Sequence, residues 1–165
     1  MTKVKQSNAV SAYNVLKQIK TKELPAEVAL AIWKNVKSLK PTATSYEDSI
    51  KDAKESLKSD NDAEMETLLK ELQEKETKEA AGTYTFTRTD NENRIKVTQY
   101  YVEAQNKINK FIKELDNKEI EVELTELKEE DIVKAIVGTD FNIGVLELID
   151  FLFDVKDDTS NPSKE

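Results

Sequence analysis

The chain has 165 residues, of which 38% are hydrophobic and 35% charged, and it carries a formal net charge of -8 with three glycines and three prolines. This balance is typical of one helix-rich domain with a large exposed surface. Cysteine and histidine are absent, which excludes disulfides, thiolate metal sites, histidine-ligated zinc and most hydrolase triads.

The first two expected elements are helices. A short helix follows Ser7 and Asn8, with apolar residues at three- and four-residue spacing up to Ile19. Pro25 fits the first turn of a second helix. That helix should end before Pro41, because proline disfavours a helical conformation in the preceding residue.

A helical arm is expected over residues 45–80. Apolar residues recur at helical spacing on both sides of the cap-rich segment 59–62, which fits one continuous helix as well as two helices with a tight joint. Gly82 follows the arm at a position where helices commonly end.

Residues 82–97 predict a β-hairpin. Apolar and polar residues alternate on both sides of a turn at 90–93, with Tyr84 and Phe86 on one strand and Ile95 and Val97 on the other. Residues 119–124 alternate glutamate with Ile, Val and Leu and are expected to form a third strand, giving a three-stranded antiparallel sheet.

A return helix is expected at residues 99–115, where apolar residues at 3, 4, 3, 4 spacing form a coiled-coil seam suited to packing antiparallel on the arm. Short helices at 125–137 and 142–153 and a polar, disordered tail at 154–165 complete the chain. The predicted fold is therefore α+β and mainly α: one elongated domain, residues 1–153, containing an antiparallel helical hairpin.

The charge is unevenly distributed. Residues 1–43 carry eight lysines and two glutamates, whereas residues 114–165 carry sixteen acidic residues and five lysines. Such asymmetry favours head-to-tail contacts between copies or separate basic and acidic partner surfaces, and it also fits solvated helix faces. Because the whole chain is acidic and its lysine-rich part lacks arginine, direct nucleic-acid binding is disfavoured.

Candidate contact residues are the large aromatics and one acidic row. Trp33 is the single tryptophan and a candidate core or interface anchor, and the glutamates of 119–123 form the polar face of the expected strand. This row fits a solvated strand face, with mimicry of a nucleic-acid backbone as the alternative. The predicted partner-binding residues are Trp33, Tyr84, Phe86, Glu119, Glu121 and Glu123.

Residues 24–39, with the sequence LPAEVALAIWKNVKSL, the charged arm, the acidic strand at 119–124 and the apolar segment 146–153 together resemble small uncharacterised proteins of tailed bacteriophages of gut bacteria. The resemblance implies a phage origin and assigns no functional residue. A weaker likeness is to prefoldin subunits, which place a β-hairpin between antiparallel helices.

The sequence predicts a non-enzymatic virion or assembly protein of a tailed phage, in the head, connector or tail, that binds other virion subunits or copies of itself without metal or cofactor. The alternative is an intracellular effector that binds and inhibits a host protein. The N-terminal residues lack the apolar segment of a signal peptide, and no apolar run spans a membrane, so location in a virion or the host cytoplasm is expected.

Overall fold

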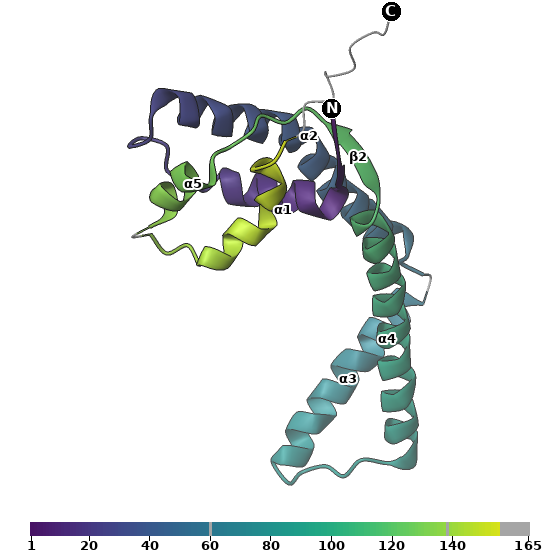
Figure 1. The fold of residues 1–165 in the computed structure, drawn as a ribbon. Helices are drawn as coiled ribbons and strands as arrows, with labels where there is room; N and C mark the ends of the chain where they lie inside the picture. Colours follow the sequence, from purple (N-terminus) through teal and green to yellow (C-terminus); the bar gives the residue numbers. More distant parts are fainter. Residues whose placement is uncertain (60, 138, 156–165) are drawn as a thin grey trace, which may run out of the picture. The chain divides into compact units, whose positions relative to one another are not determined.

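The computed structural model describes residues 1–59, 61–137 and 139–155 (Figure 1). It is mainly helical with one small antiparallel sheet, as the predicted fold class requires. Two compact units are present: unit 1 comprises Met1–Ser49 and Lys113–Glu165, and unit 2 comprises Ile50–Ile112. The single elongated domain remains a prediction, and most of the predicted tail, residues 156–165, lies outside the described residues.

The sheet of unit 1 pairs the N-terminal segment with a strand more than 110 residues further along the chain. Strands β1 (Thr2–Lys5) and β2 (Glu119–Val122) run antiparallel, with Thr2 opposite Val122 and Lys5 opposite Glu119. The predicted strand at 119–124 is confirmed in its first four residues. The three-stranded sheet is wrong for the described part of the chain, because β2 pairs with β1 and with no hairpin.

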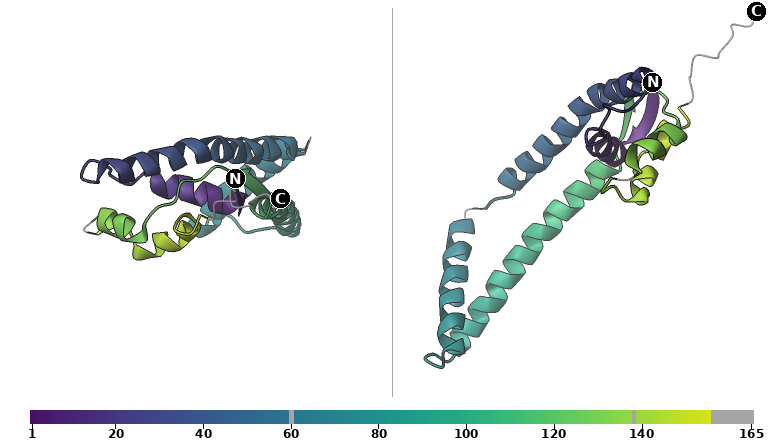
Figure 2. Two further views of the ribbon diagram at one scale, coloured as in Figure 1. Left: turned by 45° about the horizontal axis from the view of Figure 1, so that its top comes forward. Right: turned by 90° about the vertical axis from the view of Figure 1, so that its left-hand side faces the viewer.

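Unit 1 is layered around helix α1 (Gln6–Leu16). Figures 1 and 2 show α1 between α2 (Ala26–Ser56) and the 3-10 helix η1 (Ile143–Leu148). One apolar core joins these elements to the sheet and to helix α5 (Glu129–Ile136). Its fully buried large side chains are Leu16, Leu39, Ile132, Ile149 and Leu152.

Both predicted C-terminal helices differ in detail from those observed. The first is shorter than expected, since α5 covers only residues 129–136. The second is two 3-10 segments, η1 and η2 (Asp150–Leu152), rather than an α-helix. Asn142 accepts a hydrogen bond from the Gly144 N–H at the start of η1, so local side-chain capping begins the segment at the predicted place.

The predicted break at Pro41 is wrong, because α2 continues through it to Ser56. A proline inside a helix costs about 3 kcal/mol. Leu39 and Ala43, on either side of Pro41, are almost completely buried, while Pro41 itself is exposed. Packing of the flanking turns offsets the local cost of the proline.

Unit 2 contains an antiparallel helix pair. Helix α3 (Asp62–Ala80) and helix α4 (Arg88–Asp116) are joined by a short loop. Ion pairs Lys96–Glu64 at 2.9 Å and Arg94–Glu76 at 2.6 Å connect the two helices at their surface. The predicted arm is two helices, because α2 ends at Ser56 and α3 begins at Asp62.

The predicted β-hairpin at residues 82–97 is wrong. Gly82 has a φ of 71° and ends the α3 segment as expected, but the chain then forms a loop and enters α4 at Arg88. Val97 is buried with Met65 and Leu72 of α3. It therefore belongs to the helical stripe of α4, which extends eleven residues further toward the N-terminus than predicted.

Tyr46 hydrogen bonds to Asp116 within unit 1, with 2.6 Å between the donating hydroxyl and the carboxylate. Burial, together with this hydrogen bond, raises the pKa of Tyr46 to about 12. Since the folded-state pKa is raised, the contact contributes stability below about pH 10, the ordinary tyrosine pKa, and loses it as the pH rises through the folded value.

We expect a spectrophotometric titration to show a late phenolate step near pH 12 that Tyr46→Phe removes. Circular dichroism over the same range reports whether the chain stays folded. An unchanged titration in the variant would contradict the assignment.

Candidate protein-binding surface

Trp33, one of the predicted contact residues, lies on the solvent-facing side of α2. With about 3.6 residues per turn, residues 28, 32, 35 and 39 share one face of the helix and residues 30, 33, 34 and 37 the opposite face. The first four are buried. On the other face Trp33 is 55% exposed and Leu30 is 50% exposed, so burial of one face presents the other to solvent.

Asn35 anchors this helix to the segment that follows β2. Its side chain is fully buried, donates to the Thr125 carbonyl at 2.7 Å and accepts from the Thr125 N–H at 2.8 Å. The side-chain amide thus satisfies both backbone groups of one residue, as a neighbouring strand would. This contact holds residues 123–125 beside α2.

A groove of about 500 Å³ lies between these two segments. Its lining includes Trp33, Lys34, Lys37 and Pro41 from α2, with Glu123 and Thr125 on the other side. The Lys37 ammonium lies 5.1 Å from the centroid of the Trp33 ring, a cation–π distance that favours keeping the indole in place. The groove therefore combines one exposed aromatic ring and a proline with two lysines, one glutamate and two hydroxyl side chains.

The structure brings two of the six predicted contact residues together, Trp33 and Glu123, in this groove. Glu119 and Glu121 are exposed on β2, where Lys5 and Lys3 are their respective partners across the sheet. The Lys3 ammonium is 3.9 Å from the Glu121 carboxylate. The Lys5 ammonium donates to the Asn117 side chain at 3.3 Å instead. One glutamate of the predicted acidic row is thus paired with a lysine of β1.

Tyr84 and Phe86 belong to unit 2 and are half-buried. Phe86 packs against the core of the helix pair, and its ring meets Tyr84 edge-on at 6.0 Å. These two aromatics pack the α3–α4 loop against the helix pair. They are not part of the Trp33 groove.

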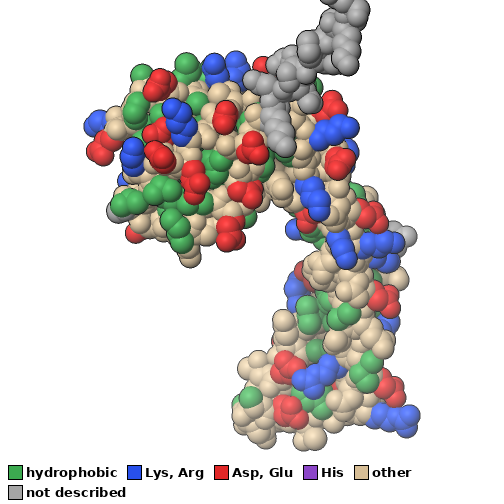
Figure 3. All heavy atoms as spheres, in the orientation of Figure 1, with side chains coloured by type: hydrophobic (Ala, Val, Ile, Leu, Met, Phe, Trp, Pro, Cys, Tyr) green, Lys and Arg blue, Asp and Glu red, His purple; other side chains and the backbone are tan. Residues whose placement is uncertain are grey.

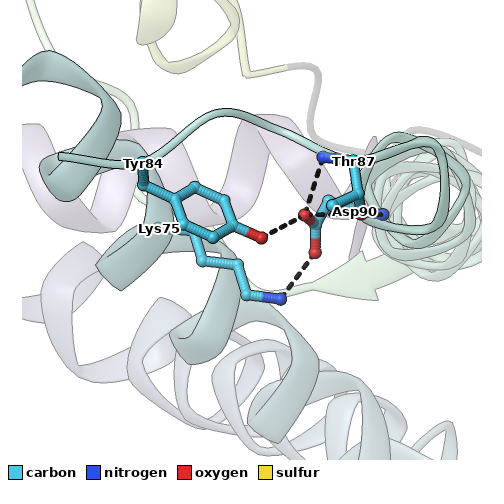
Figure 4. Close-up of polar contacts among 4 residues, drawn as sticks. All are labelled: Lys75, Tyr84, Thr87 and Asp90. Atoms are coloured by element: carbon cyan, nitrogen blue, oxygen red, sulfur yellow. Dashed lines mark hydrogen bonds and ion pairs between the residues drawn. The ribbon is translucent and has the colours of Figure 1, made fainter. Parts of the chain in front are cut away.

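Asp90 organises this loop (Figure 4). The residue is 3% exposed, and its carboxylate accepts hydrogen bonds from Lys75, from the Tyr84 hydroxyl and from the N–H and hydroxyl of Thr87. The Asp90 N–H donates back to the Thr87 hydroxyl at 3.1 Å, which completes a reciprocal cap on α4. The hydrogen bond from the Lys75 ammonium, together with those from Tyr84 and Thr87, holds the pKa of Asp90 well below its ordinary value.

Sequence reasoning did not identify Asn35 or Asp90. The sequence did contain one indication of the role of Asp90. Thr87 precedes it by three residues, and a threonine and an acidic residue at this spacing are typical of a helix start. Asn35 gave no comparable sign, because its partner Thr125 is 90 residues away along the chain.

Neither a metal centre nor a membrane helix is found in residues 1–59, 61–137 and 139–155. These residues contain no cluster of three acidic side chains placed to hold a metal ion, and their helices lack the length and apolar character needed to cross a bilayer.

No known protein family, curated protein or solved structure matches this chain.

Proposed function

We propose that this protein is a non-enzymatic assembly protein that acts through protein–protein contacts, with the Trp33 groove as one contact surface. The observation that carries this proposal is the exposure of Trp33 on a helix whose opposite face is fully packed. Tryptophan is enriched among the residues that dominate binding energies at protein interfaces. Lys34 and Lys37 beside it supply the polar rim that such interfaces commonly have.

The proposed setting is the particle of a tailed bacteriophage, as a component of the head, connector or tail. The resemblance of residues 24–39 and the following segments to small phage proteins is the reason for choosing this setting. The alternative, an effector that binds a host protein by nucleic-acid mimicry, has less support, because Lys3 and Lys5 lie opposite two glutamates of the acidic row.

The proposal is tested by mass spectrometry of phage particles purified from a host infected with the phage that encodes this chain. We expect the protein in the particles in several copies. Trp33→Asn should reduce its incorporation at least about tenfold, as expected for loss of an interface anchor, whereas Ile95→Asn should not. Ile95 is a suitable control because it is an apolar helix residue of similar exposure, 59%, in unit 2.

Two results would overturn the proposal. One is absence of the protein from purified particles that form normally without it. The other is recovery of the protein bound to one host protein in the soluble fraction and never with particles, which would favour the effector.

A further inference from the structure

Further exposed apolar side chains occur in the C-terminal segment of unit 1 that includes η1. Val137 is 70% exposed, Ile143 is 64% exposed and Leu148 is 46% exposed. Figure 3 shows hydrophobic side chains gathered on this part of the molecule, with acidic side chains around them. The exposed Asp140 and Glu147 belong to the same segment. We call Val137, Ile143, Leu148, Asp140 and Glu147 the acidic patch.

The outward face of α2 has the opposite charge. We call Leu30, Trp33, Lys34 and Lys37 the basic patch. Residues 26–41 carry three lysines and one glutamate, whereas residues 126–154 carry eight acidic residues and two lysines. Each patch thus has exposed apolar side chains in a surrounding of one dominant charge, and the two charges are complementary.

The two patches lie on different sides of unit 1. The basic patch is on α2, the acidic patch is on η1 and the segment between α5 and η1, and α1 packs between α2 and η1 (Figures 1 and 2). Both patches are therefore available at once. One copy can use its basic patch on one neighbour and its acidic patch on another.

We propose that the partner of the basic patch is the acidic patch of a second copy of this chain, so that copies associate head to tail. This inference rests on the proposed assembly function and names the partner within it. Contact of two basic patches or of two acidic patches would oppose like charges. The charge pattern therefore favours a heterologous contact, which produces a ring or a filament, over a symmetric dimer.

The contact should be weak in dilute solution. Each patch offers two or three exposed apolar side chains, which is fewer than a stable interface of about 800 Å² per partner contains. We expect a dissociation constant on the order of 100 μM, as for small transient contacts. Raising the salt concentration from about 0.05 M to about 0.5 M should weaken it, because exposed charges are then screened.

Sedimentation velocity of matched variants tests the inference. Trp33→Asn alters only the basic patch and Ile143→Asn only the acidic patch, and Ile95→Asn is the control outside both. Wild type and Ile95→Asn should increase in mass as the protein concentration is raised toward about 1 mM, which is well above the expected dissociation constant. Each patch variant should associate at least about tenfold more weakly, while circular dichroism reports an unchanged fold.

The decisive sample is an equal mixture of the two patch variants. Trp33→Asn retains an intact acidic patch and Ile143→Asn retains an intact basic patch, so the mixture should form a one-to-one complex that grows no further. A symmetric dimer through α2 would instead leave Ile143→Asn dimeric when it is alone, and that result would overturn the head-to-tail contact.

Wild-type protein that stays monomeric at about 1 mM would also overturn the self-contact, because even a weak contact would be populated there. If the protein were then still found in phage particles, the proposed assembly function would hold, but the partner would be another protein. Loss from the particles as well would remove both proposals. A mixture of the two variants that stays monomeric while wild type associates would mean that wild type uses other surfaces.

Discussion

Asn35→Ala is expected to lower the free energy of unfolding by about 2–6 kcal/mol, since the variant leaves two backbone groups of the half-buried Thr125 without their partners at about 1–3 kcal/mol each. Asn35 is fully buried, and its amide makes both hydrogen bonds with Thr125. The cost should exceed the gain in helix propensity that alanine brings, which is about 0.5 kcal/mol.

Urea unfolding followed by circular dichroism measures this loss. Asn8→Ala is a matched control, because Asn8 is also in a helix of unit 1 but is exposed, and it should change the unfolding free energy by less than about 0.5 kcal/mol. Equal unfolding midpoints for the two variants would contradict the role given to Asn35.

Asn35→Asp refines this test. The carboxylate still accepts from the Thr125 N–H but has no proton to donate to the Thr125 carbonyl, and it places a charge in the core. The variant should therefore be destabilised at pH 7 and should recover part of the loss on acidification, when the carboxyl gains a proton. Because Thr125 and Glu123 line the Trp33 groove, both substitutions should also weaken binding through that groove.

The helices were the most predictable part of this fold, because their pattern is carried by many residues. Apolar spacing located α1 and residues 99–115 of α4, and Pro25 marked the start of α2. The predicted end of α2 at Pro41 was wrong, because there a local rule about proline opposed the packing of the helix. Proline disfavours a helix through a steric clash and one lost hydrogen bond. The burial of Leu39 and Ala43 on either side of Pro41 outweighs that local cost.

The false hairpin came from alternation over too few residues. Tyr84 and Phe86 alternate with threonines, but both lie in a loop held by Asp90. Ile95 and Val97 alternate as well, yet Val97 is buried in the helix pair and Ile95 is exposed on the same helix. Two apolar residues two positions apart fit a strand and a helix about equally, and only the longer stripe through Ile108 distinguishes them.

The sheet shows a different limit of sequence reasoning. The alternation of glutamate and apolar residues after residue 118 predicted β2 because it is long and regular. Its partner β1 has one buried apolar residue, Val4, and lies more than 110 positions away. The complementary charges of Lys3 and Lys5 were visible in the sequence, but they do not specify register, which depends on the packed face of the sheet.

Asp90→Asn is expected to open the loop between α3 and α4. In the wild type the carboxylate receives four hydrogen bonds, from Lys75, Tyr84 and two groups of Thr87. The amide brings N–H groups toward some of these donors and leaves the Lys75 ammonium without a negative partner. Hydrogen exchange of the backbone amides of residues 83–91 should be faster by roughly tenfold or more, since the reciprocal cap is lost.

Asp90→Asn should also change how the stability of unit 2 depends on pH. The pKa of Asp90 is held well below its ordinary value by the hydrogen bonds from Lys75, Tyr84 and Thr87. In the unfolded chain the carboxyl titrates near its ordinary value of about 4. The network therefore stabilises unit 2 fully above about pH 4 and loses its contribution progressively as the pH falls below that value. Asp90→Asn should lack this part of the acid dependence.

Glu92→Gln is the matched control for both measurements. Glu92 is on the same helix and pairs with Arg88 at 2.9 Å, but both side chains are largely exposed, and exposed pairs contribute little to stability. Its exchange rates and acid profile should follow the wild type. If Asp90→Asn also follows the wild type between about pH 2 and pH 5, the range in which the carboxyl of the unfolded chain gains its proton, the α3–α4 loop is held by the packing of Phe86 and not by the carboxylate.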